Sequence, residues 1–142
     1  MKKLLMTVLV LGLAAGSAWQ ASAGQAAKPA AKPDMAKVAG FWELEVNADG
    51  EIIYLTMTLA VVEGKLTGKT SEQNGMFTDA PLGDIVLEGD LLKCTATVPS
   101  PPDGATRPWA IELKIGADTA DGSIGNAELM ISASLTGRRT KK

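Results

Sequence analysis

The sequence contains no histidine, and this absence removes most enzyme active sites from consideration. Histidine is the usual general base beside a serine or cysteine nucleophile and a common ligand in zinc-hydrolase and non-haem iron sites. Neither a phosphate-binding Gly-x-x-x-x-Gly-Lys run nor a dinucleotide-binding glycine motif occurs. Catalysis by paired carboxylates remains to be considered. Most of the candidates fall on predicted outward faces of strands, where an acidic residue is explained by its exposure to solvent: Glu43, Glu45, Asp79, Asp84 and Glu112. We therefore expect a protein without catalytic residues, metal site or cofactor.

Cysteine is nearly absent as well, because Cys94 is the only one. A single thiol cannot form a disulfide within the chain, so the core alone must hold the fold. Cys94 lies in the alternating run Leu92, Cys94, Ala96 and Val98, whereas Lys93 points to the opposite face. We interpret the thiol as a small buried apolar group, because a reactive thiol needs a nearby cation to lower its pKa.

Long hydrophobic runs are missing except at the start of the chain. Lys2 and Lys3 precede an apolar stretch at residues 4–15, and Ala21-Ser22-Ala23 supplies the small residues that a signal peptidase recognises. The apolar stretch is shorter than the roughly 20 residues needed to cross a bilayer. The pattern predicts a cleaved signal peptide at residues 1–23 and an exported protein, periplasmic or extracellular, without stable membrane insertion.

An excess of positive charge is also missing. The chain has 14 basic and 16 acidic residues, and without the two lysines of the signal peptide its net charge is −4. Nucleic acids and anionic membranes select for clustered Lys and Arg, so we expect no nucleic-acid partner. The one basic cluster lies at residues 138–142, and we interpret its last part, residues 140–142, as a solvated tail.

Composition divides the rest of the chain in two. Residues 24–39 contain Ala-Lys-Pro twice, at 27–29 and 31–33, a composition that buries little apolar surface and favours a flexible linker. Residues 40–139 are rich in Thr, Val, Ile and Leu and have the size of one small domain.

Apolar and polar residues alternate within this domain, which is the pattern of β-strands with one buried face. The clearest runs are Ile53, Leu55, Met57, Leu59 and Val61, then Trp109, Ile111, Leu113 and Ile115, and finally Ile131, Ala133 and Leu135. The pattern predicts strands at 40–47, 51–62, 65–71, 77–87, 91–98, 107–116, 120–125 and 129–138. Pro81 and Gly83 make the fourth strand the least regular, so we expect it to be bulged or edge-like.

Glycine-containing turns separate the predicted strands. An acidic residue followed by glycine and, two positions later, an aliphatic residue occurs four times, at Asp49-Gly50, Glu63-Gly64, Glu88-Gly89 and Asp121-Gly122. Glycine reaches positive φ without steric cost, as tight hairpin turns require. The other breaks fall at 72–75, 99–107 and 125–128. This succession of hairpins predicts an up-and-down antiparallel meander, whose apolar face is hidden either in a closed barrel or in a sandwich.

A tryptophan in the first predicted strand favours the barrel. Trp42 lies on the same face of its strand as Leu44 and Val46 and so points inward, where its ring can close one end of a barrel. If the last strand pairs with the first, the guanidinium of Arg139, or of its neighbour Arg138, can lie over the indole. Gly40 would let another segment pass close to the backbone. We expect Gly40, Trp42 and Arg139 to close the barrel.

These closing residues, together with the meander, resemble the lipocalin and calycin superfamily. The repeated Leu-Thr-Gly at 66–68 and 135–137, with the acidic-Gly turns, is similar to short lipocalin-like barrels of exported bacterial proteins. The resemblance covers residues 40–139. It implies an eight-stranded antiparallel up-and-down barrel and, for many lipocalins, a cavity that holds a small apolar molecule. The chain differs from typical lipocalins because it is shorter and lacks both the disulfide of many secreted members and a C-terminal helix.

Two functions remain open for such a barrel. In the first, a small apolar ligand lies in the interior, lined by Trp42, Leu55, Met57, Leu59, Leu92, Ala96, Ile111, Leu113 and Leu135. Small residues such as Ala96 favour free space there, whereas Met57 and the leucines favour a filled interior. In the second, a domain with a solid core has a structural or protein-interaction role, for example as a secreted inhibitor that acts through residues 99–108, a loop stiffened by four prolines.

Overall fold

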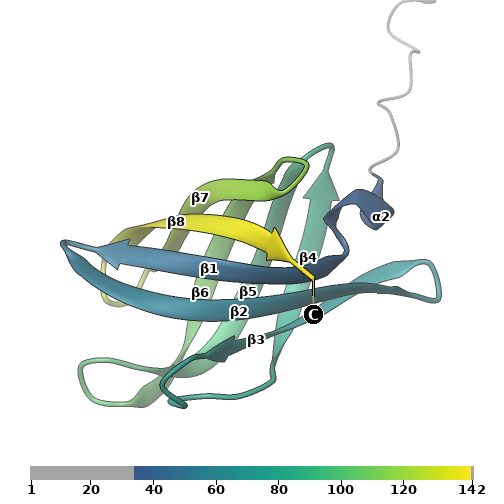
Figure 1. The fold of residues 1–142 in the computed structure, drawn as a ribbon. Coiled ribbons are helices and arrows are strands. Elements are labelled where there is room, and N and C mark those ends of the chain that lie inside the picture. Colours follow the sequence, from purple (N-terminus) through teal and green to yellow (C-terminus); the bar gives the residue numbers. More distant parts are fainter. Residues whose placement is uncertain (1–33, 142) are drawn as a thin grey trace, which may run out of the picture. The chain divides into compact units, whose positions relative to one another are not determined.

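The computed structural model describes residues 34–141, which form a short helix followed by eight β-strands. Each strand pairs antiparallel with the next, and the last pairs with the first, so the sheet closes into a barrel (Figure 1). The predicted all-β, eight-stranded up-and-down barrel is confirmed. The predicted signal peptide and the linker up to residue 33 lie outside the described residues. The elements are α2 (Met35–Val38), β1 (Gly40–Ala48), β2 (Glu51–Val62), β3 (Lys65–Glu72), β4 (Ala80–Glu88), β5 (Leu91–Ser100), β6 (Ala105–Ile115), β7 (Thr119–Asn126) and β8 (Ile131–Thr140).

The barrel closes where the first strand meets the last. Seven consecutive residues of β1, from Phe41 to Asn47, pair with β8, and Trp42 lies opposite Arg139. Figure 1 shows β8, in yellow, running beside β1, in blue. Closure pairs the two edges that an open meander would expose to other chains.

Alternation along the strands buries one face of the sheet inside the barrel. In β1, Trp42, Leu44 and Val46 are at most 5% exposed, while Glu43 between them is exposed. The inward side chains of the strands form one apolar core cluster. Burying a large apolar side chain contributes about 1.5–3 kcal/mol, so this core holds the fold while Cys94 remains a free thiol.

The structure corrects the long loop predicted at residues 99–108. β5 continues to Ser100 and β6 begins at Ala105, so the turn between them has only four residues. Pairing of β5 with β6 runs to Ser100 and Ala105, whereas pairing of β5 with β4 ends at Ala96 and pairing of β6 with β7 ends at Ala110. Pro99 and Pro108 therefore lie where their strands have a single partner, which is where a sheet tolerates a residue without an N–H group.

The predicted turn at Asp121-Gly122 is also wrong. Both residues lie within β7, and the turn before this strand falls at 116–118. A Cβ on Gly122 would lie 1.8 Å from the carbonyl oxygen of Glu112 on β6. Glycine is required at this position because the two backbones approach closely, not because the chain turns.

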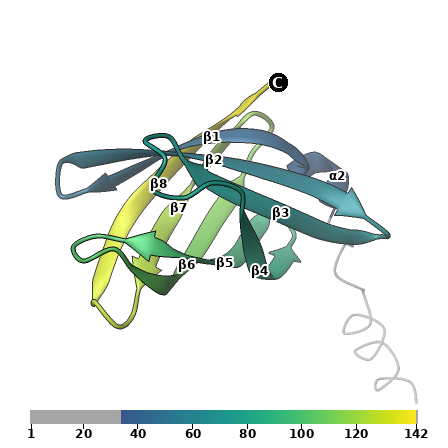
Figure 2. The ribbon, with the colours of Figure 1, turned by 90° about the horizontal axis from the view of Figure 1, so that it is seen from below.

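Pairing between β3 and β4 is the shortest in the barrel. The two strands pair only through Lys69 with Pro81 and Thr70 with Ala80, whereas β2 and β3 pair over eight positions. The register of β4 against β5 also shifts after Gly83. The bulged fourth strand predicted from the sequence is therefore confirmed. Figures 1 and 2 show the β2–β3 hairpin projecting beyond the ends of its neighbours, away from this short pairing.

The folded part of the chain begins before residue 40, the limit predicted from the sequence. Asp34 caps α2, and its Oδ1 accepts a hydrogen bond from the amide of Ala36 at 3.1 Å. Val38, the last residue of the helix, is 2% exposed and belongs to the core cluster. At the other limit, β8 includes Thr140. Within the part of the chain that the structure describes, no helix is long and apolar enough to span a membrane.

Candidate functional site

All nine residues predicted to line a ligand cavity lie in the barrel core. Each is at most 5% exposed, and they belong to one packed cluster: Trp42, Leu55, Met57, Leu59, Leu92, Ala96, Ile111, Leu113 and Leu135. Three grooves stand out among residues 34–141, and of the nine only Ile111 lines one of them. The structure thus brings these residues together as a core, and their contact with a ligand stays a prediction.

One end of the barrel is plugged by Trp42 and Arg139. The indole Nε1 of Trp42 donates a hydrogen bond to the carbonyl oxygen of Val38 at 3.0 Å, and the ring is 1% exposed. The guanidinium carbon of Arg139 lies 4.7 Å from the centroid of this ring, within the range of a cation–π contact. The same guanidinium donates to the carbonyl oxygens of Ala39, at 3.0 Å, and of Lys37. The plug therefore joins α2, β1 and β8.

Gly40 and Arg138 have different places at this end. Gly40 has a φ of 140°, which side-chain-bearing residues rarely adopt, and an added Cβ would lie 3.7 Å from Nη1 of Arg139. Arg138, the alternative to Arg139, pairs with Glu43 in the ladder and lines a groove on the outside of the barrel. Arg139 is therefore the arginine that covers the indole.

A groove with a mainly apolar lining lies between β3 and β4, where barrel pairing is shortest. Its volume is about 610 Å³, and its apolar lining includes Leu66, Leu82, Ile85 and Leu87, with Met35 of α2. Small-molecule pockets commonly measure about 300–1,000 Å³. Leu82 is 9% exposed and belongs to the core cluster, so the groove reaches down to the core itself.

A β-bulge turns the apolar side chains of β4 toward this groove. Leu82 faces inward, and strict alternation from it would turn Ile85 and Leu87 outward. Asp84, with a φ of 49°, lies in the register shift between Gly83 and the next paired residue of β4. The one-residue insertion reverses the alternation, so Ile85 and Leu87 join Leu82 in the lining.

A glycine in β3 lets side chains from two other strands lie close to its backbone. A Cβ on Gly68 would lie 2.7 Å from Cδ2 of Leu59 on β2 and 2.8 Å from Cδ1 of Leu82 on β4. The side chains of Leu59 and Leu82, which come from the strands on either side of β3, therefore both lie close to the backbone of Gly68 beside the groove.

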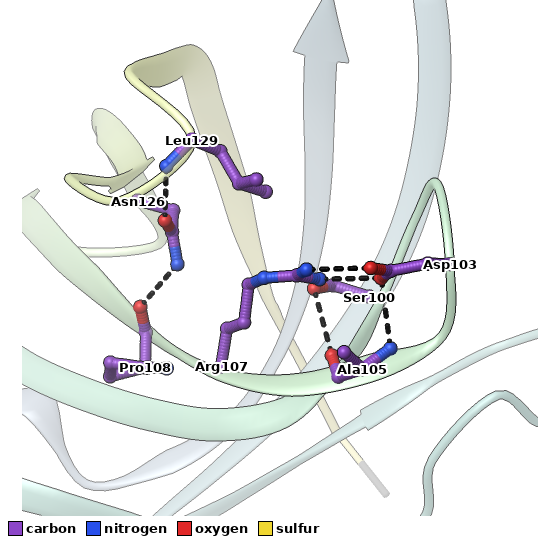
Figure 3. Close-up of polar contacts among 7 residues, drawn as sticks. All are labelled: Ser100, Asp103, Ala105, Arg107, Pro108, Asn126 and Leu129. Atoms are coloured by element: carbon purple, nitrogen blue, oxygen red, sulfur yellow. Dashed lines mark hydrogen bonds and ion pairs between the residues drawn. The ribbon is translucent and has the colours of Figure 1, made fainter.

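The β5–β6 turn lies at the other end of the barrel from Trp42, because β5 runs in the same direction as β1. Figure 3 shows Arg107 in a double ion pair with Asp103, in which Nη1–Oδ1 and Nη2–Oδ2 are both 2.7 Å. Oδ1 of Asp103 also accepts from the amide of Ala105 at 3.0 Å, and Oγ of Ser100 donates to the carbonyl oxygen of Ala105 at 3.4 Å. The hydrogen bonds from Arg107 hold the pKa of Asp103 well below its usual range. The turn is thus fixed by its own side chains.

A buried asparagine holds the neighbouring β7–β8 turn. Asn126 is 2% exposed, and its Nδ2 donates to the carbonyl oxygen of Pro108 at 2.8 Å (Figure 3). Its Oδ1 accepts from the amide of Leu129 at 2.9 Å. One side chain therefore ties this turn to the start of β6.

The carboxylates considered for catalysis are spread over the barrel. Glu43 and Glu45 line an outer groove of about 550 Å³ over β1, β7 and β8, and Glu112 lines another of about 320 Å³. Asp84 lines both the β3–β4 groove and, together with Glu112, the groove of about 320 Å³, whereas Asp79 forms a surface ion pair. Nowhere in residues 34–141 do three His, Cys, Asp or Glu side chains gather in a way that could hold a metal ion.

Cys94 is buried, as its place in an alternating run predicts. It is 4% exposed, and burial raises the pKa of its thiol to about 12. The thiol is therefore protonated at neutral pH and behaves as a small apolar group.

Sequence reasoning did not find the groove residues. Leu82, Ile85 and Leu87 were assigned to no site, because the alternation that locates inward residues fails in β4. Leu66 of β3, where alternation holds, was assigned to no site either. The available signal was the irregularity itself, an aliphatic run next to a strand-weakening proline and glycine. Such a run marks the place where a barrel side chain can change faces.

Comparison with known proteins finds no match to this chain among protein-family models, curated proteins or solved structures. The function therefore has to be argued from the groove and the turn.

Proposed function

We propose that the protein is an exported, non-catalytic, lipocalin-like barrel that binds a small apolar molecule in the groove between β3 and β4. One observation carries this proposal: an apolar groove of about 610 Å³ lies where the ladder of an otherwise well-paired barrel is shortest. The resemblance of the sequence to lipocalins supports it, as does the predicted signal peptide. We place the ligand at this groove, with the packed interior as its floor.

The lining offers a gain in free energy on binding. Leu66, Ile85 and Leu87 are only partly buried, although they face the same groove as the buried Leu82. Covering apolar surface stabilises a complex by about 25 cal/mol per Å² before the costs of association. The neighbouring strands hold both walls in place, so little ordering is needed when a ligand enters.

Neighbouring residues of β4 provide a direct test. Leu87 lines the groove, whereas Val86 is 46% exposed and does not. We expect the neutral probe N-phenyl-1-naphthylamine to bind the unmodified protein with increased fluorescence, Leu87→Gln to weaken binding, and Val86→Gln to leave it unchanged. Thermal unfolding of both variants would show that each is folded. Absence of binding to the unmodified protein, or equal loss in two folded variants, would contradict the proposal.

A second candidate function is protein binding through the β5–β6 turn. The double ion pair between Asp103 and Arg107 favours it, because a turn that is already fixed loses little conformational entropy on binding. If this turn inhibits a protease, the protein will slow peptide hydrolysis by subtilisin, trypsin or papain, and Asp103→Ala will weaken that inhibition. Unchanged hydrolysis by all three enzymes would argue against this candidate.

A further inference from the structure

Two opposite charges line the β3–β4 groove without pairing with each other. Lys65 comes from β3 and Asp84 from β4. The ion pairs found in residues 34–141 are Lys69 with Asp79 and Arg107 with Asp103, so neither groove charge takes part in one. Both side chains are exposed and can meet a charged group of a ligand.

The two charges lie on opposite walls at similar distances from the point where the strands join. The last pair between β3 and β4 is Lys69 with Pro81. Lys65 is four residues from this pair along β3, and Asp84 is three residues from it along β4. Because the strands are antiparallel, both positions lie in the same direction from the pair. The charges therefore flank one stretch of the groove, next to Leu66 and Ile85.

The backbone at Asp84 is unusual for a strand. Non-glycine residues with positive φ also occur at Asp49, Glu63, Asp79 and Met130, but those four lie in turns or loops. Within the strands of the described chain, Asp84 alone has this conformation, with a φ of 49°. Glycine would adopt it with less strain, and strained residues gather at ligand sites. An aspartate here places a carboxylate at the edge of the apolar groove, which is also the edge of the outer groove that Lys93 and Glu112 line.

We propose that the groove takes an amphiphile with an apolar chain and a zwitterionic head group, an inference that rests on the proposed function. The chain lies on Leu66, Ile85 and Leu87, the ammonium group lies at Asp84, and the acidic group lies at Lys65. A purely anionic head would meet the like charge of Asp84, and a purely cationic head would meet that of Lys65. Only a head group with both charges is complementary to both walls.

Four probes with the same chain separate the head-group chemistry from apolar binding. Dodecylphosphocholine is zwitterionic, dodecanoate anionic, dodecyltrimethylammonium cationic and dodecyl maltoside neutral. Each is titrated into the full protein below its micelle concentration by isothermal calorimetry, at low and at high salt. We expect dodecylphosphocholine to bind most tightly and its advantage to shrink at high salt, because exposed charges are screened.

Two neutralising variants test the assigned roles, and the neighbouring ion pair supplies matched controls. Lys65→Gln should weaken dodecylphosphocholine and dodecanoate about threefold to fivefold, the scale of an exposed ion pair, without weakening the cationic probe. Asp84→Asn, which tolerates positive φ, should weaken dodecylphosphocholine and the cationic probe without weakening dodecanoate. Lys69→Gln and Asp79→Asn remove the same charges outside the groove and should change no affinity by as much as twofold.

The outcomes distinguish this inference from the proposed function. If all four probes bind equally well and the variants change nothing, the groove binds apolar molecules but the zwitterionic head group is wrong. The same holds if the control variants lose as much affinity as the groove variants. If none of the four probes binds, the apolar groove itself is not a site, and both proposals fall.

Discussion

Two junctions between neighbouring strands of the barrel, here called seams, differ greatly in the number of paired residues: β1 with β8, the strong seam, and β3 with β4, the weak seam. The first has seven paired positions and carries the contact of Arg139 with Trp42. The second has two paired positions and carries the apolar groove. The stronger seam joins strands far apart in the sequence, whereas the weaker one joins consecutive strands.

This difference follows from what each seam must offset. Bringing β1 and β8 together closes a much longer loop than joining β3 to β4, which costs roughly 2 kcal/mol more in loop-closure entropy and needs more contacts to offset it. β3 and β4 are separated by a short loop and are each held by another neighbour, β2 or β5. A barrel can therefore be loosened at a local seam, and an apolar groove formed there, without losing the closed fold.

The largest effect should come from removing the plug of the strong seam. Trp42→Ala is expected to lower the free energy of unfolding by about 3–5 kcal/mol, because it empties a fully buried site. Leu66→Ala, in the partly exposed wall of the weak seam, should cost about 1 kcal/mol or less. Urea unfolding followed by circular dichroism measures both. Equal losses would contradict the comparison.

Matched glycines should show how tightly each seam is packed. A Cβ on Gly137 would lie 2.6 Å from Cδ2 of Leu44, which is 2% exposed, so Gly137→Ala should cost about 1–3 kcal/mol. Gly68→Ala should cost a similar amount, because Leu82 can move into the groove but the buried Leu59, at 2.7 Å, and the carbonyl oxygen of Thr58, at 3.0 Å, cannot. Gly83→Ala is the control, since its nearest neighbour would be 3.8 Å away. A loss at Gly83 as large as those at Gly68 and Gly137 would contradict this account of the packing.

The arginine of the strong seam should contribute a smaller amount. Arg139→Lys keeps the positive charge but removes the planar group that covers the indole and bonds two carbonyls, so we expect a loss of about 1 kcal/mol. Arg138→Lys, on the outer face of the same strand, should change the free energy of unfolding by less than about 0.5 kcal/mol. Thermal unfolding of the two variants side by side checks this. Equal midpoints would mean that the contact of Arg139 with the indole adds nothing measurable to the stability of the fold.

The smallest effect concerns the thiol of Cys94 on β5, one strand away from the weak seam. Cys94 lies between the residues of β5 that face the bulge of β4. Burial raises its pKa to about 12, so at pH 8 iodoacetamide should alkylate it only during opening. If the weak seam opens by itself, the alkylation rate will be independent of low urea concentrations; dependence on urea matching global unfolding would show that it does not.

The same pKa shift sets a pH dependence. Because the folded pKa lies above that of an exposed thiol, the unfolded chain loses its proton first as pH rises. The free energy of unfolding should therefore be unaffected near neutral pH and fall as the pH rises from about 9 toward 12. Cys94→Ala should lack this component of the alkaline decline, and an identical decline in both proteins would contradict the assignment.

The strong seam could be predicted from the sequence, and the weak one only in part. Alternation placed Trp42 inside and Arg139 on the same face of the last strand, and closure then brought them together. The irregularity of β4 was visible in Pro81 and Gly83, but the residue that carries the bulge, Asp84, has no sequence signature of its own. A bulge reverses which residues of the strand point into the barrel, so the sequence pattern could not show that Ile85 and Leu87 face the groove.

Glycine gave an ambiguous signal for a related reason. Three acidic-Gly pairs mark hairpin turns, as expected, but Gly122 lies in a strand where Glu112 comes too close for a side chain. Local sequence does not distinguish a turn from a close approach between strands, because both require a missing Cβ. The sequence also did not predict that Pro99 and Pro108 lie in paired strands. Their positions are tolerated because the pairing of β5 with β4 and of β6 with β7 ends before it reaches them.

Because Arg139 lies in the last strand, its contact with Trp42 can form only after nearly the whole chain has been made. The ribosome synthesises β1 long before β8, so a nascent chain that ends at residue 130 has an exposed apolar face and two unpaired edge strands. Such intermediates associate with one another readily. We therefore expect the closed barrel to form only after the eighth strand has been made, and premature stops upstream should yield aggregated protein rather than a smaller folded domain.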